Sequence, residues 1–218
     1  MMFLFAVCRF VRSQAFLSNL TAGGIAVPEF GTSVIQSKAA SKGLSRSRVM
    51  SDNTMITVYP FDGALYTYYE SPFMHKIDPT SLATIGREDM GRRGLLSQAA
   101  HPHWDREGNM FTLGLRLSIT GPRYTITRFK KGEGGRSLPK RGVTVGEIPC
   151  TNSFFPSYMH SFAITDHWIV VVEQPLVVSW TSKLAHNSKF TRNPGERGGD
   201  GSGLGDKQAG LLCTQMEG

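Results

Sequence analysis

The sequence has few cysteines and no long apolar run. Its three cysteines, Cys8, Cys150 and Cys213, are an odd number without a Cys-x-x-Cys spacing, which argues against a disulfide scaffold or a cysteine zinc site and favours a reducing compartment. No apolar run reaches the ~18 residues that a membrane-spanning helix needs. What is present is an excess of positive charge, with 24 Lys and Arg against 17 Asp and Glu in 218 residues, and a hydrophobic fraction of 40%. That fraction is large enough for a packed core and excludes a wholly disordered chain.

The two ends of the chain and one internal segment differ from the rest. Residues 1–8 are apolar and are predicted to form a strand. Residues 36–48 carry four positive charges and no negative one. A solvated loop is the ordinary interpretation of such a run, and contact with an anionic membrane surface is the alternative. No aromatic residues interleave with these charges, so we expect no nucleic-acid partner. Residues 181–218 hold eight of the 24 glycines, a composition that predicts a disordered tail.

Residues 49–180 show the pattern of β-structure. The β-branched and aromatic segments 55–59 and 64–69 flank an Asp-Gly pair at 62–63, which is a strong signal for a hairpin. Further strands are predicted at 99–101, 110–115, 124–129 and 168–173, with a turn at 107–109. No long segment has helical periodicity. Short strands joined by Gly, Pro and Asp turns indicate an all-β sandwich, barrel or propeller, and periodicity alone leaves the choice among these open.

The histidines are the candidate metal ligands. His101 and His103 are two residues apart, so in a strand both rings would face one side and could meet one metal ion; ordinary surface or core histidines are the alternative. His160 lies between apolar neighbours, where a hydrogen-bonded core residue is more common than a ligand. Its separation from His101 is 160 − 101 = 59 residues, and propeller blades of ~40–50 residues would place the two on inner strands of nearby blades. His75 and His167 stand beside predicted turns and are expected at the surface.

Seven short segments, in order along the chain, resemble motifs of the carotenoid cleavage oxygenases. That family includes the β-carotene oxygenases and the retinoid isomerase of the retinal pigment epithelium. The matching segments are FVRS at 10–13, PEFGT at 28–32, SDN at 51–53 with VYP at 58–60, YESPF at 69–73, AHPHWD at 100–105, PSYMHSF at 156–162 and VEQP at 172–175. One such motif would be a weak signal, but seven in the family's order are specific, and they cover the chain from about residue 8 to about residue 180.

The resemblance implies a seven-bladed β-propeller with a non-haem Fe(II) on its axis, held by four neutral histidines. Residues 1–180 would form the N-terminal part of it, a partial propeller of about three to four blades on the ~40–50-residue scale, followed by the Gly-rich tail at 181–218. His101 and His160 match the first two ligands by motif, and His103 matches a position that is not a ligand. The third and fourth histidine segments have no counterpart in the 218 residues.

The activity that the resemblance implies is cleavage of a conjugated double bond of a carotenoid or apocarotenoid by O2, giving aldehydes. The isomerase branch of the family instead uses the iron as a Lewis acid on a retinyl ester. The alternative is a non-catalytic β-rich fragment that lacks two of the four iron ligands. The expected location is the cytoplasm. A peripheral membrane surface is a further candidate partner, although the family's aromatic-rich membrane stretch is replaced here by the basic residues 38–48.

Glu70 and Phe30 match two further positions of the family. Glu70 matches a carboxylate that would accept a ring N–H from a histidine ligand, which we take to be His160, and so fix its tautomer and raise its basicity. An exposed charge at a strand end is the alternative. Phe30 matches an aromatic residue of the substrate tunnel, where a ring face can stabilise cationic character in a polyene; a core phenylalanine is the alternative. Tyr69 departs from the motif, which has threonine, and its phenol could crowd the oxygen site.

Overall fold

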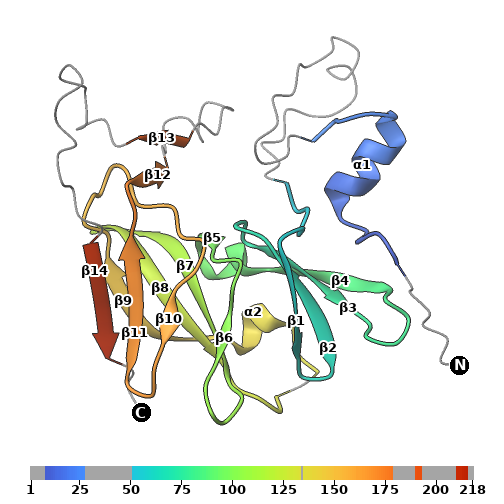
Figure 1. The fold of residues 1–218 in the computed structure, drawn as a ribbon. Coiled ribbons are helices and arrows are strands. Elements are labelled where there is room, and N and C mark those ends of the chain that lie inside the picture. Colours follow the sequence, from blue (N-terminus) through green and yellow to red (C-terminus); the bar gives the residue numbers. More distant parts are fainter. Residues whose placement is uncertain (1–7, 28–50, 134, 179–189, 193–209, 216–218) are drawn as a thin grey trace, which may run out of the picture.

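The structure, a computed structural model, describes residues 8–27, 51–133, 135–178, 190–192 and 210–215 (Figure 1). Strands predominate in these residues, which confirms the all-β prediction. The strands are β1 (Thr57–Phe61), β2 (Ala64–Tyr68), β3 (Phe73–Ile77), β4 (Thr84–Asp89), β5 (Leu95–Gln98), β6 (His103–Trp104), β7 (Met110–Ser118), β8 (Gly121–Phe129), β9 (Val143–Pro149), β10 (Ala163–Ile164), β11 (Trp168–Glu173), β12 (Leu176–Val178), β13 (Phe190–Arg192) and β14 (Gly210–Gln215). The helical elements are α1 (Gln14–Ala22), the 3-10 turn η2 (Met90–Arg93) and α2 (Leu138–Arg141). None of the helices in this described part is long and apolar enough to cross a membrane.

The first sheet is an antiparallel meander with the strand order β1-β2-β3-β4. Its first hairpin turns at Asp62 and Gly63, as the sequence predicts. Both residues have positive φ, 47° and 75°, which is the conformation that a two-residue type I′ turn requires. The pairing therefore starts at once, with Phe61 opposite Ala64, and it runs without a break along β1 and β2.

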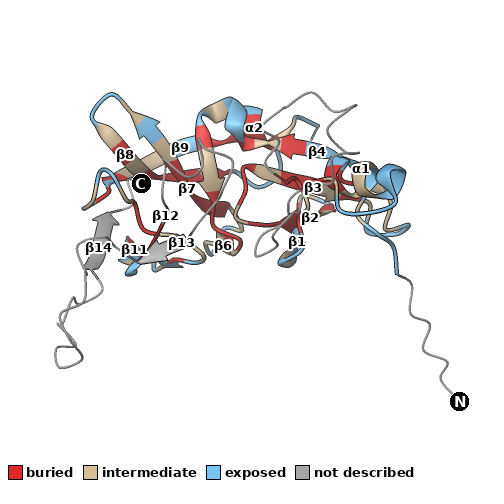
Figure 2. Cartoon of the chain, turned by 90° about the horizontal axis from the view of Figure 1, so that it is seen from above, coloured by how far each residue is buried: buried red, intermediate tan, exposed pale blue. Residues whose placement is uncertain are grey.

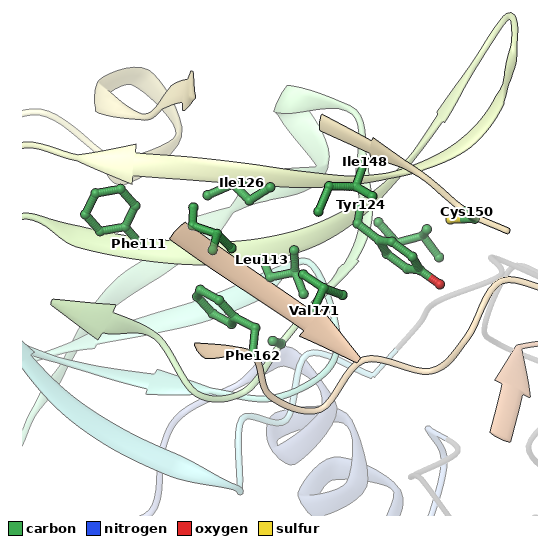
Figure 3. Close-up of a cluster of buried hydrophobic side chains, with 11 residues drawn as sticks. Phe111, Leu113, Tyr124, Ile126, Ile148, Cys150, Phe162 and Val171 are labelled. Atoms are coloured by element: carbon green, nitrogen blue, oxygen red, sulfur yellow. The ribbon is translucent and has the colours of Figure 1, made fainter. Parts of the chain in front are cut away.

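The second sheet, β5-β7-β8-β9 with β6 beside β7, has side chains packed on both faces. Residues 110–115 of β7 are all buried, because alternate side chains enter two different cores. Leu113 lies in a cluster that reaches Val171 of β11 (Figure 3), whereas Met110 lies in a cluster that reaches Tyr68 of β2. The sheets thus lie side by side, with α1 at one end and β11 at the other (Figure 2).

The strand predicted at 99–101 is displaced in the structure. β5 ends at Gln98 and β6 begins at His103, and both pair with β7. The N–H of Ala99 still donates to the carbonyl of Leu113 on β7, 2.7 Å away, and the chain leaves the ladder at Ala100, whose N–H donates to the carbonyl of His160, 3.2 Å away. The expected strand is therefore a link between two shorter strands, and this link carries His101.

β11 is the middle strand of the third sheet, β10-β11-β14, and its bounds match the predicted strand at 168–173. β14 comes from the tail that was predicted to be disordered, and it pairs with β11 along its whole length. β13, from the same tail, pairs with β12. These two segments are the parts of 181–218 that the structure describes, and the short apolar run around residues 211–213 suits a strand although the tail as a whole is rich in glycine. The disorder of the tail stays a prediction. The rest of 181–218, residues 1–7 and the basic run 36–48 lie outside the described residues.

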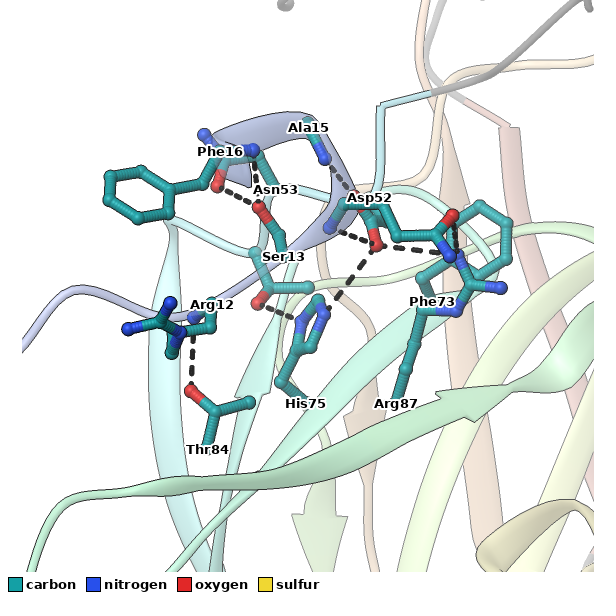
Figure 4. Close-up of polar contacts among 12 residues, drawn as sticks. Arg12, Ser13, Ala15, Phe16, Asp52, Asn53, Phe73, His75, Thr84 and Arg87 are labelled. Carbon is teal, nitrogen blue, oxygen red and sulfur yellow. Dashed lines mark hydrogen bonds and ion pairs between the residues drawn. The ribbon is translucent and has the colours of Figure 1, made fainter. Parts of the chain in front are cut away.

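α1 is a nine-residue helix that the sequence analysis did not predict. The hydroxyl of Ser13 caps it by accepting the backbone N–H of Phe16 at 2.9 Å. Asp52, far along the chain, caps it as well: its Oδ1 accepts the N–H of Ala15 at 2.9 Å and its Oδ2 accepts that of Gln14 at 3.0 Å (Figure 4). A negative charge at a helix N-terminus is stabilising, so this helix depends on a residue outside its own segment.

His75 is buried on β3, which corrects the prediction that it lies at the surface. Its side chain is in contact with Thr54 Oγ1, 3.0 Å from Nδ1, and with Asp52 Oδ2, 3.6 Å from Nε2 (Figure 4). Arg87 approaches the same carboxylate at 3.3 Å. Burial alone would raise the pKa of Asp52, but hydrogen bonds from His75 and from the helix backbone outweigh it and hold that pKa far below its usual range. His75 therefore belongs to the polar cluster that docks α1, whereas His167 is exposed, as expected.

Candidate metal centre

His101 and His160 lie together where the second and third sheets meet. His101 is in the link between β5 and β6, and His160 precedes β10. Two contacts join these segments beside the rings. The backbone N–H of Ala100 donates to the carbonyl of His160, and the Nε2 of His103 lies 2.7 Å from the carbonyl oxygen of Phe162. Because its Nε2 is bound to this carbonyl, His103 takes no part in the pair, and the idea that it shares a metal with His101 is not supported.

The two rings of the pair face each other through Nε2. These atoms are 2.9 Å apart, and the ring planes meet at 68°. Two neutral imidazole nitrogens come this close only when one carries a proton and donates it to the other, or when both lone pairs point at one ion. An ion ~2.0–2.1 Å from each of two imidazole nitrogens, with bonds near a right angle, holds those nitrogens about 2.9 Å apart. The pair therefore fits two adjacent positions of a metal site.

The remaining ring nitrogen of His160, Nδ1, is hydrogen-bonded to Oε1 of Glu70. The Glu70 side chain is only 8% exposed, whereas that of His160 is 43% exposed, so the carboxylate is not the exposed strand-end charge considered as an alternative. An ionised carboxylate can only accept, which puts the proton on Nδ1 and leaves the lone pair on Nε2. Burial and a hydrogen bond to Glu70 raise the pKa of Tyr158, which keeps that phenol protonated.

The remaining ring nitrogen of His101 faces Tyr59, a residue that the sequence analysis quoted within a motif without assigning it a role. The Tyr59 Oη lies 3.3 Å from His101 Nδ1. The phenol ring packs against Trp104 and Tyr68, with ring centroids 5.2 and 6.0 Å away. Burial, and then the neighbouring His160, lower the pKa of His101, so the neutral ring that binds metals prevails at neutral pH.

The described residues contain only part of the predicted site. No group of three or more His, Cys, Asp or Glu side chains in this part of the chain could hold a metal ion, so the pair His101 and His160 offers two ligands. Phe30, predicted to line a substrate tunnel, lies outside the described residues and its role stays a prediction. Tyr69 is buried next to Glu70 in the chain. The metal-binding role of the pair likewise stays a prediction that its geometry fits.

Comparison with known families shows where this chain belongs. A family model described as retinal pigment epithelial membrane protein matches residues 4–198, most of the sequence. The chain belongs to this family. Its membership confirms the resemblance to carotenoid cleavage oxygenases that the seven motifs indicate.

Curated relatives in the family are carotenoid enzymes. The chain is 38% identical over 182 residues to the carotenoid isomerooxygenase of Drosophila melanogaster, a match that covers 81% of this chain and 29% of the relative. It is 31% identical over 180 residues to the beta,beta-carotene 15,15'-dioxygenase of Gallus gallus, covering 77% of this chain and 34% of the relative. The chain therefore spans about a third of the length of the curated relatives it matches.

Two solved structures share the fold of this chain. Cobalt-substituted apocarotenoid oxygenase from Synechocystis aligns with a TM-score of 0.65 at 20% identity, over 96% of this chain and 42% of that protein. A lignostilbene dioxygenase from Pseudomonas brassicacearum aligns with a TM-score of 0.58 at 21% identity, over 85% and 36%. These likenesses confirm the prediction of a partial β-propeller, and the cobalt substitution in the first means that a relative holds a metal.

Proposed function

We propose that this chain supplies two ligands to a non-haem Fe(II) centre in a protein that uses O2 to cleave a double bond of a carotenoid or apocarotenoid to aldehydes. The observation that carries the proposal is the pair of Nε2 atoms 2.9 Å apart, with Glu70 behind one of the rings. The carotenoid enzymes among the relatives support the substrate class, and the cobalt-substituted relative supports a metal.

In this proposal His101 and His160 hold the iron, and imidazole is a donor that suits it. When bound, Fe(II) supplies a redox-active ion with open coordination positions. Glu70 keeps the proton of His160 on Nδ1, and so keeps the Nε2 lone pair directed at the site. The side chain of His160 is 43% exposed, so the pair can be approached from one side. Phe30 would face the polyene and stabilise positive charge on it.

The same proposal covers location. The protein would act in the cytoplasm beside a membrane that supplies the apolar substrate, and the basic residues 36–48 would contact the anionic lipid surface. Binding of the chain to vesicles with and without anionic lipid tests this part. Equal binding to both would contradict it.

One observation favours the alternative, a non-catalytic β-rich fragment: the described residues offer no third metal ligand. Anaerobic Fe(II) titration of the purified chain separates the two. We expect weak binding that is lost in His101→Ala and in His160→Ala and kept in His167→Ala, a control at an exposed histidine. Binding that is indifferent to both substitutions would refute the metal site. Stoichiometric binding that survives dialysis would show a site more complete than two ligands.

Activity provides the second test. We expect no aldehyde from β-carotene or an apocarotenoid with this chain, Fe(II) and O2, because misplacement of reacting groups by ~1 Å already costs ~100-fold in rate and two of the four family ligands have no counterpart here. Product that is lost in both His101→Ala and His160→Ala would show that this chain alone is competent. Product that survives both substitutions would come from adventitious iron.

A further inference from the structure

Four side chains form a continuous line of polar contacts through the candidate metal centre. Tyr59 Oη lies 3.3 Å from His101 Nδ1, and His101 Nε2 lies 2.9 Å from His160 Nε2. The far nitrogen of His160 is bound to Glu70. The two ends of this line differ chemically, because a carboxylate only accepts a hydrogen bond, whereas a phenol can donate or accept.

This difference determines where the protons lie along these four side chains when no ion is bound. Glu70 holds the His160 proton on Nδ1, so His160 Nε2 is a bare acceptor. The close Nε2–Nε2 contact then requires a proton on His101 Nε2, which donates to His160. That leaves His101 Nδ1 bare, and the Tyr59 hydroxyl donates to it. One neutral arrangement thus satisfies all the contacts.

With an ion bound, the arrangement would change at the Tyr59 end only. His101 and His160 would both direct their Nε2 lone pairs to the ion, so the proton of His101 would lie on Nδ1, where the Tyr59 oxygen would accept it. The His101 ring carries one proton before and after, and the phenol changes only the direction of its O–H bond. A carboxylate in the place of Tyr59 would favour the second arrangement alone.

We propose that Tyr59 is a positioning residue for His101. The Tyr59 hydroxyl donates to His101 Nδ1 in the metal-free chain and accepts a hydrogen bond from that nitrogen's N–H in the metal-bound chain. The proposal rests on the metal site of the proposed function. The packing of the phenol ring against Trp104 and Tyr68 holds the oxygen in place, so the exchange of roles needs no movement of the backbone. Glu70 fixes one ligand permanently, and Tyr59 supports the other in both states.

The test compares Tyr59→Phe with Tyr68→Phe. Both remove one hydroxyl from the same hairpin, but the Tyr68 hydroxyl donates to the sulfur of Met110 rather than to a histidine. Long-range proton–nitrogen NMR of the metal-free chain reports which ring nitrogen of His101 carries the proton. We expect Nε2–H on His101 in all three chains, because the bare Nε2 of His160 requires it. The nitrogen chemical shift of His101 Nδ1 should change only in Tyr59→Phe, where the hydroxyl that donates to it is gone, and His160 should be unchanged in all three.

Titration with Co(II) gives the second readout. Loss of a partner behind a histidine ligand costs about 10–100-fold in metal affinity, so we expect this loss in Tyr59→Phe and a change of less than about twofold in Tyr68→Phe. A His101 Nδ1 chemical shift that does not respond to Tyr59→Phe overturns the proposal. A proton on His101 Nδ1 in the metal-free wild-type chain also overturns it, and that result needs no variant. If the wild-type chain bound no Co(II), the proposed metal site would fail, while the NMR measurement at His101 Nδ1 would still decide the role of Tyr59 in the metal-free chain.

Discussion

Replacement of Asp52 by alanine should release α1 from the first sheet. The carboxylate is buried and accepts two backbone N–H groups of the helix, those of Ala15 at 2.9 Å and Gln14 at 3.0 Å. Hydrogen bonds to a charged group contribute about 1.5–3 kcal/mol each. Water can replace part of that once the helix end opens, so we take the lower figure for each bond and expect α1 to lose about 3 kcal/mol of its local stability.

Hydrogen exchange measures this loss directly. Since 1.4 kcal/mol corresponds to a factor of ten in an equilibrium constant, the amides of α1 should exchange about 100-fold faster in Asp52→Ala. Asp78→Ala is the matched control, because Asp78 also accepts two backbone N–H groups, those of Thr80 and Ser81, in an exposed turn far from the helix in sequence. Exchange in α1 within about threefold of wild type would refute the reasoning. Equally fast exchange in β7 would show that the carboxylate holds the sheets rather than the helix.

Three further predictions concern carboxylates and their partners, and the last returns to Asp52. Glu70→Gln should weaken Co(II) binding about 10–100-fold by removing the charge that fixes His160, and a titration with Co(II) that matches wild type would contradict this. Tyr124→Phe should lower the free energy of unfolding by about 1–3 kcal/mol, because the Tyr124 hydroxyl donates to Glu173 and accepts a buried backbone N–H; urea unfolding measures the loss. The pKa of Asp52 is lower in the folded chain than its ~3.9 in the unfolded chain. The stability that the ionised Asp52 gives to the folded chain is therefore complete above about pH 5 and is lost as the pH falls below about 4. Asp52→Asn should flatten the acid side of a curve of unfolding free energy against pH, and an unchanged curve would contradict this.

Strands that are marked by a tight turn or by a run of β-branched residues could be predicted from the sequence. The Asp-Gly turn at 62–63 fixed the first hairpin because both residues tolerate positive φ, and the run at 168–173 is apolar and β-branched enough to form β11. The propeller itself came from resemblance rather than periodicity, because sandwich, barrel and propeller strands share the same alternation.

The features that sequence reasoning missed depend on partners far along the chain. α1 has no acidic residue in its first turn, and the negative charge at its N-terminus comes from Asp52 instead. The partners that bury His75 are Thr54 and that same Asp52, which no spacing rule connects. Tyr59 lies in the VYP motif at 58–60, but its contact with His101 joins two residues that are 42 positions apart. This contact forms only when the sheets pack together.

The contacts of residues 100 and 103 with the segment 160–162 have a consequence for how an ion comes and goes. Bringing together two residues separated by 59 positions costs a flexible chain roughly 3–4 kcal/mol in loop-closure entropy. Here the fold closes that loop with bonds that involve no ion, so an incoming ion need not supply this free energy. The two ligands should stay in place when an ion dissociates. Exchange of one metal for another would then proceed without unfolding, and the choice of metal would depend on its preference for imidazole and on what the cell supplies.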